Sequence, residues 1–241
     1  SAERARLKAA LADIAGKRIE IPLIIGGREV RTGHLGQAVM PHDHRHVLAD
    51  YHQAGEAEIA QAIAAAMAAK PQWAALRWEE RAGIFLKAAE LLSGKYRYVM
   101  NAISMLSTSK SAYQAEIDAA CELIDFLRFN VYFAQQIYAD QPLYAPKGVW
   151  NSVQQRPLEG FVFAVAPFNF TAIAGNLAAA PAIMGNTVVL KPPEQASPAI
   201  LRLGELIAEV LPPGVINMVS GRGADVGDPL VRHPEVRKIT M

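Results

Sequence analysis

The bulk properties of the chain are those of an ordinary globular protein. It has 241 residues, of which 51% are hydrophobic and 20% charged, and its formal net charge is +1. That length allows one large α/β domain or two small ones with a sizeable core. The small net charge gives no field that would attract nucleic acid or an acidic membrane, and no apolar run approaches the roughly 20 residues that span a bilayer. We therefore expect neither nucleic acid nor a membrane as a partner.

Cysteine usage and the N-terminus bear on the cellular compartment. Cys121 is the only cysteine, so no intramolecular disulfide can form and a reducing compartment is compatible. The charged N-terminus is not followed by an apolar segment, so it does not resemble a secretory signal. We expect a cytoplasmic protein, or one of the mitochondrial matrix if the source is eukaryotic.

The N-terminal quarter of the chain predicts a helix followed by strands. Residues 3–16 are rich in alanine and leucine, with charges spaced as in a short helix. Residues 21–30 predict two strands joined by a turn at Gly26 and Gly27, because a Gly-Gly pair between apolar runs favours a hairpin. A further extended segment is expected near residues 47–52.

A helical period dominates the next part of the chain. It predicts one helix from Glu56 that ends before Pro71, a second over residues 80–92 and a long third over residues 114–138. The apolar side of the third helix is formed by Ile117, Cys121, Ile124, Leu127, Val131 and Ala134. On that side Cys121 is expected to be an inert core residue.

Beyond Pro142, strands and helices alternate. The pattern predicts strands at 161–165, 187–190, 215–219 and 236–240, and helices near 171–184, 197–210 and 225–232. This β-α-β-α-β-α-β order with short connections implies a parallel sheet covered by helices on both faces. The chain stops inside an expected core strand, so we expect a truncated protein.

Unusual residues follow three of the predicted strands. The three segments are Ala166-Pro167-Phe168-Asn169, Lys191-Pro192-Pro193-Glu194 and Ser220-Gly221-Arg222-Gly223-Ala224-Asp225-Val226-Gly227. Ligands of open parallel sheets bind outside the carboxyl ends of the strands, so all three segments belong to one candidate binding edge. Taken singly, Asn169 could be a helix N-cap and Lys191 a solvated charge, and the glycine run differs by one position from a dinucleotide fingerprint.

These motifs resemble the aldehyde dehydrogenase superfamily, which has Pro-Phe-Asn and Lys-Pro-x-Glu at two successive strand ends. Within it the chain is most similar to the Δ1-pyrroline-5-carboxylate dehydrogenase group, also called L-glutamate γ-semialdehyde dehydrogenases. The likeness covers nearly the whole chain and rests on residues 114–120, 122–126, 128–130, 157–162, 167–173 and 175–178. It implies an α/β fold with a Rossmann-like parallel sheet, a helical and hairpin N-terminal region before it, and no catalytic domain.

The resemblance also implies a division of the chain. Residues 1–52 would be an N-terminal helix and β-hairpin arm, and residues 53–140 the helical part of the NAD-binding domain. An extended segment for oligomerisation would cover residues 141–157, so we expect a homo-oligomer. Residues 158–241 would form the truncated Rossmann-like sheet.

Family chemistry gives roles to residues at the sheet edge. The amide of Asn169 would donate to the oxyanion that forms on the aldehyde, and Lys191 and Glu194 would hold the adenosine ribose of NAD, where the carboxylate disfavours a 2′-phosphate. Further cofactor contacts are expected from Ala166, Pro167, Phe168, Pro192, Gly221, Gly223 and Gly227. Phe170 and Glu116 would line the substrate side, although ordinary roles as a core ring and a solvated carboxylate stay open for them.

Two parts of the family pattern are missing or altered. The nucleophilic cysteine and the glutamate general base belong after Met241, and Cys121 is no substitute for the nucleophile. We therefore expect the chain alone to be the inactive cofactor-binding half of an enzyme that oxidises L-glutamate γ-semialdehyde to L-glutamate in proline catabolism. Relatives commonly have glycines around Lys110, where this chain has Ser107, Thr108 and Ser109.

Alternatives to this prediction belong to other classes. The chain could be a non-catalytic binding or assembly module that acts through residues 141–156, or part of an aldehyde dehydrogenase with another substrate. The run His42-Asp43-His44-Arg45-His46 could suggest a zinc site. Arg45 interrupts the run, and the resemblance makes it a surface loop in a metal-free enzyme, so we expect no metal.

Overall fold

The computed structural model describes residues 1–194 and 197–241, apart from the side chains of residues 197, 200, 201 and 207. The helices in this part of the chain are α1 (Ala2–Ala15), α2 (Glu56–Ala75), α3 (Trp78–Ser93), α4 (Arg97–Thr108), α5 (Ala112–Ala115), the π-helical η1 (Glu116–Glu122), α6 (Leu123–Ala139), α7 (Thr171–Ile183), α8 (Ser197–Val210), the π-helical η2 (Gly223–Gly227) and α9 (Asp228–Arg232). The strands are β1 (Ile19–Ile21), β2 (Leu23–Ile25), β3 (Arg28–Val30), β4 (Leu35–Met40), β5 (Asp43–His52), β6 (Phe161–Val165), β7 (Val188–Lys191), β8 (Ile216–Met218) and β9 (Val236–Thr240).

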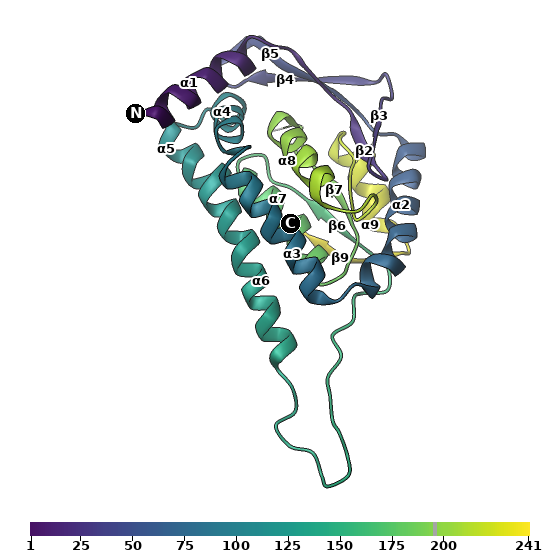
Figure 1. Ribbon diagram of the computed structural model, residues 1–241. Coiled ribbons are helices and arrows are strands. Elements are labelled where there is room, and N and C mark those ends of the chain that lie inside the picture. The colour runs from purple at the N-terminus through teal and green to yellow at the C-terminus, as the bar shows by residue number, and fades with distance from the viewer. Residues whose placement is uncertain (195–196) are drawn as a thin grey trace.

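The strands form two sheets (Figure 1). The larger sheet has the order β3-β2-β8-β7-β6-β9, and β8, β7, β6 and β9 pair in parallel, which confirms the predicted α/β fold. The predicted hairpin is also present, but β2 pairs antiparallel with β8 and so adds two strands to this sheet. The smaller sheet, β1-β5-β4, lies beside α1 and α4 at the top of Figure 1.

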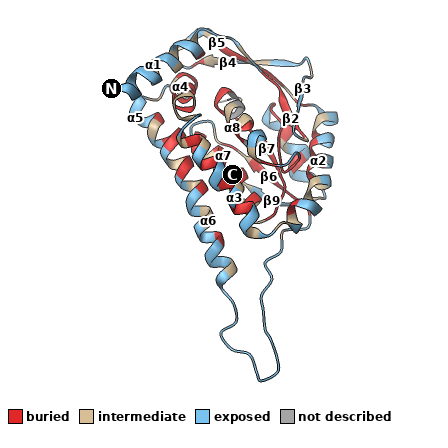
Figure 2. Cartoon of the chain, in the orientation of Figure 1, coloured by how far each residue is buried: buried red, intermediate tan, exposed pale blue. Residues whose placement is uncertain are grey.

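Both faces of the larger sheet are covered by helices. Along β6, Val162 and Ala164 point into a core shared with α3, α6, α7 and α8, whereas Phe161 and Phe163 point into a second core with α2 and α9. Successive side chains of a strand face opposite sides, so a strand between two cores must be apolar at every position. Each fully buried Phe stabilises the fold by roughly 1.5–3 kcal/mol. Figure 2 shows the buried strands in the middle of the molecule.

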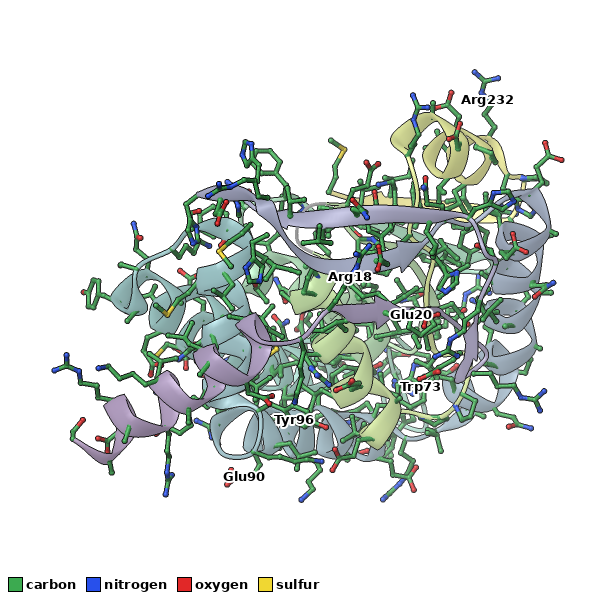
Figure 3. All side chains as sticks on the ribbon, turned by 90° about the horizontal axis from the view of Figure 1, so that it is seen from above. Arg18, Glu20, Trp73, Glu90, Tyr96 and Arg232 are labelled. Carbon is green, nitrogen blue, oxygen red and sulfur yellow. The ribbon has the colours of Figure 1, made fainter. Side chains whose placement is uncertain are left out.

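Two long side chains from other helices donate hydrogen bonds to the last carbonyls of α7. The indole Nε1 of Trp73 donates to the carbonyl of Ala182 at 2.9 Å, and Nε of Arg81 donates to the carbonyl of Ile183 at 2.9 Å. Both side chains are almost fully buried. Trp73 lies among the packed side chains in Figure 3, whereas Arg232 points away from the molecule. The last carbonyls of a helix have no partner within it, so these donors satisfy groups that would otherwise be buried unpaired.

The third predicted helix is interrupted by a π-helical segment. The chain forms α5, then η1, then α6, and the wider π turn changes which residues face inward. Ile124, Leu127 and Ala134 are buried as predicted, but Ile117 and Cys121 are exposed. The prediction of a core cysteine was therefore wrong. Asp118, which a regular helix would have turned outward, is 2% exposed.

Other elements also differ from the prediction. Helix α2 continues through Pro71 to Ala75, although a proline removes one helical hydrogen bond. Its buried face includes Ile59, Ala66 and Trp73, so packing on both sides of Pro71 outweighs that loss. Helix α4 was not predicted from the sequence, and its buried face combines apolar residues with three polar ones: Asn101, Ser104 and Ser107.

The turn after α4 has an unusual backbone. Ser109 ends the helix with φ 55° and ψ 29°, and no other non-glycine residue in the described part of the chain has a positive φ. Glycine adopts this left-handed region without penalty, whereas a residue with a side chain does so at a cost. Here the Nδ1 atom of His42 and the hydroxyl of Ser109 are 2.8 Å apart, so a hydrogen bond holds the turn.

An extended arm leaves the body of the protein between α6 and β6 (Figure 1). Residues 139–156 are exposed throughout, and the arm appears as a pale loop below the body in Figure 2. Its apolar side chains are exposed too: Leu143 fully and Trp150 to 90%. The exposed Phe133 lies on α6 just before the arm.

Replacing Gly160 tests the packing between the start of β6 and the segment before β9. A Cβ atom on Gly160 would collide with the backbone carbonyl of Glu235, so Gly160→Ala is expected to lower the free energy of unfolding by about 1–3 kcal/mol. The matched control is Gly83→Ala on the exposed face of α3, where a Cβ meets nothing within 4 Å. There alanine is expected to stabilise by about 0.8–1 kcal/mol. Urea unfolding of both variants measures the difference, and equal effects would contradict this packing.

Candidate functional site

The carboxyl ends of three parallel strands meet at one edge of the larger sheet. In the register of the sheet Val165 lies opposite Lys191, and Leu190 lies opposite Met218. The segments that follow β6, β7 and β8 therefore begin side by side, as the sequence predicted. Backbone hydrogen bonds continue past the strands, since the amides of Ala166 and Val219 donate to the carbonyls of Lys191 and Leu190 at 3.0 Å.

The side chain of Lys191 is enclosed at this edge. The residue is only 8% exposed, and its Nζ donates to the carbonyl of Pro192 at 3.3 Å. Burial lowers the pKa of Lys191, because it disfavours the charged form, and the negative charge of Glu194 opposes that shift. A solvated surface charge would lack both effects, so that alternative for Lys191 was wrong.

The carboxylate of Glu194 is close enough to act on two neighbours. It opposes the lowering of the Lys191 pKa, and it adds to the effect of burial in raising the pKa of Tyr51. Glu194 itself is half-buried. An ammonium donor and a carboxylate acceptor at one strand end can bind a pair of neighbouring hydroxyl groups.

The glycine segment after β8, residues 220–227, contacts the loop between β5 and α2. The amide of Ala54 donates to the carbonyl of Ser220 at 2.8 Å. Gly221 has a φ of +151°, and a Cβ there would lie 2.6 Å from Cγ2 of Val226, so the fold itself requires glycine at this position. At Gly223 and Gly227 a Cβ would meet nothing within 4 Å. Their backbone is open to the approach of a ligand.

Asn169 lies in the exposed turn between β6 and α7. Phe170, not Asn169, is the N-cap residue of α7, so the N-cap alternative for Asn169 was wrong. Its side-chain amide makes no hydrogen bond to any described residue, whereas its backbone carbonyl accepts one from Nζ of Lys110 at 2.5 Å. The neighbouring rings of Phe168 and Phe170 are exposed as well, so Phe170 is not an ordinary core residue.

Asp118 caps α7 from a distant part of the chain. Its Oδ2 and Oδ1 atoms accept hydrogen bonds from the amides of Thr171 at 3.0 Å and Ala172 at 2.9 Å. Nζ of Lys110 lies 2.6 Å from Oδ2 of Asp118 and 4.5 Å from the centre of the Phe170 ring. The start of a helix commonly binds phosphate in nucleotide-binding folds, but here a carboxylate of the chain occupies it.

Sequence reasoning missed the part that Lys110 and Asp118 play. Asp118 was treated as a polar residue of a regular helix, and Lys110 only as a neighbour of replaced glycines. A buried carboxylate 53 positions from its backbone partner leaves no local pattern. The charge of Lys110 was the only signal in the sequence, and it does not reveal the partner.

Glu116 faces a different hollow from Asn169. Its carboxylate forms an ion pair with Arg97 and accepts a hydrogen bond from Asn101. The hydrogen bond from Arg97 to Glu116 raises the pKa of Arg97. The hollow is lined by residues of α1, the end of α3, α4 and α5 together with Glu116: Glu3, Arg4, Leu7, Ser93, Arg97, Tyr98, Asn101, Ala112 and Tyr113. Glu116 is thus held in place and is not a solvated carboxylate, and Asn169 and Phe170 are not among the residues around it.

Neither a metal-binding cluster nor a membrane-spanning helix occurs among the described residues. Within residues 1–194 and 197–241 no group of three or more His, Cys, Asp or Glu side chains is arranged to hold a metal ion, and His42 contacts Ser109 instead. Over the same ranges no helix has the length and apolar character needed to cross a bilayer.

Comparisons with known proteins agree with this architecture. The model of the aldehyde dehydrogenase family matches residues 31–241. A delta-1-pyrroline-5-carboxylate dehydrogenase of Agaricus bisporus is 46% identical over 241 residues, which are 99% of this chain and 44% of that protein. A mitochondrial delta-1-pyrroline-5-carboxylate dehydrogenase of Dictyostelium discoideum is 47% identical over 237 residues, 97% of this chain and 42% of that protein.

A solved structure gives the same result in three dimensions. The Delta-pyrroline-5-carboxylate dehydrogenase from Mycobacterium tuberculosis bound with NAD has a TM-score of 0.96 and 49% sequence identity, and the match covers 99% of this chain and 45% of that one. The chain spans less than half the length of these relatives. Its strand-end motifs, its sheet and the match over residues 31–241 agree, and the chain belongs to the aldehyde dehydrogenase family.

Proposed function

We propose that this chain is the NAD-binding part of an enzyme that oxidises L-glutamate γ-semialdehyde to L-glutamate. The observation that carries the proposal is the common sheet edge, where the turn that contains Asn169 follows β6 and the enclosed Lys191 ends the neighbouring strand β7. Relatives that match nearly the whole chain are named delta-1-pyrroline-5-carboxylate dehydrogenases, and one of them is bound with NAD.

The residues at the edge fit the adenosine end of NAD. Lys191 can donate to ribose hydroxyls and Glu194 can accept from them, while the carboxylate would repel the 2′-phosphate of NADP. Gly223 and Gly227, in the segment after the neighbouring strand β8, have no side chain that would cover their backbone. Pro192, Gly221 and the Ala166–Phe168 segment would complete the cofactor side. Because Asp118 occupies the start of α7, the phosphates would lie away from that helix.

The residues on the aldehyde side would act by binding and orientation. When bound, NAD would supply the acceptor for the hydride. Asn169 would donate its side-chain amide to the oxygen on which negative charge develops, an effect of about 2.7–4 kcal/mol for such donors. Phe170 would flank the aliphatic chain of the aldehyde. Glu116 is held by Arg97 and Asn101 in a hollow that Asn169 and Phe170 do not line, so we assign it no contact with the aldehyde.

We further propose that the arm at residues 139–156 pairs subunits of a homo-oligomer. Apolar side chains such as Leu143 and Trp150 are costly to leave in water, and a contiguous exposed apolar surface commonly marks an interface. The same arm is the feature that favours the second candidate function, a non-catalytic assembly module. For the site of action we propose the cytoplasm, or the mitochondrial matrix in a eukaryote, since several eukaryotic relatives are named mitochondrial.

Cofactor binding by the chain itself is the first test. Lys191→Met is expected to raise the Kd for NAD about tenfold or more, because hydrogen bonds from a charged donor are lost. Glu194→Gln is expected to weaken NAD binding and to narrow the preference over NADP about tenfold. Isothermal titration measures these constants. Lys87→Met, at an exposed lysine of α3, is the matched control and should bind like the unaltered chain. Unchanged affinity in Lys191→Met, with the fold intact by thermal melting, would refute this ribose site.

The oxidation of the aldehyde should be measured with the full polypeptide that is encoded by the gene of this chain. We expect kcat/KM for L-glutamate γ-semialdehyde to exceed that for propanal at least tenfold, measured by NADH absorbance. Asn169→Ala is expected to lower kcat by about 10²–10³-fold, the loss seen when an oxyanion donor is removed. Equal turnover of both aldehydes would favour a different substrate. Binding without any oxidation would favour the assembly module.

The arm is tested by its oligomeric state. The double variant Leu143→Ser and Trp150→Ser removes two exposed apolar side chains and leaves the core unchanged. We expect the oligomer to dissociate, while the melting temperature of the subunit stays that of the unaltered protein. Light scattering after size-exclusion chromatography gives the mass. Replacing the exposed polar Gln154 by Ser in the same arm serves as the control. An unchanged mass in the double variant would contradict a role of the arm in pairing.

A further inference from the structure

We propose that Lys110 and Asp118 are positioning residues for Asn169, an inference that rests on the proposed function. Both hold the backbone from the carbonyl of Asn169 onward. Lys110 binds the carbonyl of Asn169 itself, and Asp118 binds the amides of Thr171 and Ala172 just beyond it. The two holding residues are joined to each other at 2.6 Å.

The arrangement fixes the backbone and leaves the side chain available. All the hydrogen bonds in this group end on backbone atoms of residues 169, 171 and 172, or link Lys110 to Asp118. The amide of Asn169 binds no described residue, so it is not needed to stabilise its own turn. A donor must be in place before the oxyanion forms if its effect is not to be lost in reorganisation. Because Lys110 and Asp118 bind the backbone of this turn, the position of Asn169 is set before the oxyanion forms.

Burial makes this ion pair different from the surface pairs of the chain. The side chains of Lys110 and Asp118 are 15% and 3% exposed, whereas those of Lys17 and Asp13 are 63% and 58% exposed. The direct attraction between two opposite charges is stronger away from water. Removing one partner leaves the other charge buried and unpaired. The ammonium also lies over the ring of Phe170, the residue after Asn169, which adds a cation–π contact.

The turn at Ser109 delivers Lys110 to this position. Its left-handed backbone ends α4, and the hydrogen bond to His42 keeps the turn in place. Asp118 comes from η1, where the π turn directs it inward. Two departures from regular helix thus supply the two charges that hold Asn169.

The charge of Lys110 can be removed and restored chemically. In a Cys121→Ala background the chain has no other thiol, so Lys110→Cys gives a unique site. Alkylation with 2-bromoethylamine in urea, followed by refolding, forms a thioether with release of bromide and restores an ammonium at nearly the length of lysine. Alkylation with iodoacetamide gives a neutral side chain and is the paired control.

The readouts are local. Amide hydrogen exchange at Thr171 and Ala172 should become at least tenfold faster in Lys110→Cys, return to within twofold after 2-bromoethylamine, and stay fast after iodoacetamide. The side-chain NH₂ signals of Asn169 in ¹H–¹⁵N spectra should follow the same pattern, which a loss of general stability would not produce. Exchange in β6 and β7 should be unchanged throughout. The same steps at Lys17→Cys should alter none of these signals.

Asp118→Asn provides a second variant that keeps the shape of the side chain. It should speed exchange at Thr171 and Ala172 and shift the Asn169 signals even if Lys110→Cys refolds poorly. Equal effects of the two alkylating agents, or an unchanged Asn169 signal in Asp118→Asn, would overturn the positioning role. Neither NAD nor an aldehyde enters these measurements. A chain that shows the ammonium rescue but binds no NAD would refute the proposed function alone.

Discussion

The parallel pairing of β6 with β7 is the constraint on which the candidate site depends. It sets Val165 opposite Lys191, so the chain leaves both strands at the same edge and the turn of Asn169 starts beside the enclosed lysine. The pairing itself is stabilised by burial on two faces, since each strand has a helical core on either side. A shift of one residue in this register would turn Lys191 toward the opposite face and separate the two groups.

Most of the larger sheet could be predicted because its physical signals are local. Apolar runs mark β6 to β8, and a helical period marks α3. The parts that could not be predicted have signals of another kind. The buried face of α4 includes the polar Asn101 and Ser104, and the π turn of η1 reverses the expected placement of Cys121 and Asp118. In both cases tertiary packing overrides the local pattern.

For the candidate site the same distinction holds. Strand ends can be located from the sequence, so Asn169, Lys191 and Glu194 could be named together with the edge they share. The neighbours that fix their surroundings come from far away in the chain: Asp118 reaches Thr171, and Glu194 acts on Tyr51. Such partners follow from the fold and not from spacing. The exposed amide of Asn169 and the hollow around Glu116 likewise became visible only in three dimensions.

The carboxylate of Asp118 at the start of α7 has a consequence for the thermodynamics of ligand capture. Many helix ends in nucleotide-binding proteins stay unsatisfied until a phosphate arrives, and part of the free energy of binding is then lost in ordering them. Here the end is satisfied within the polypeptide. The hydrogen bonds of this turn form when the chain folds, so a ligand that binds here should lose little further free energy in ordering the backbone.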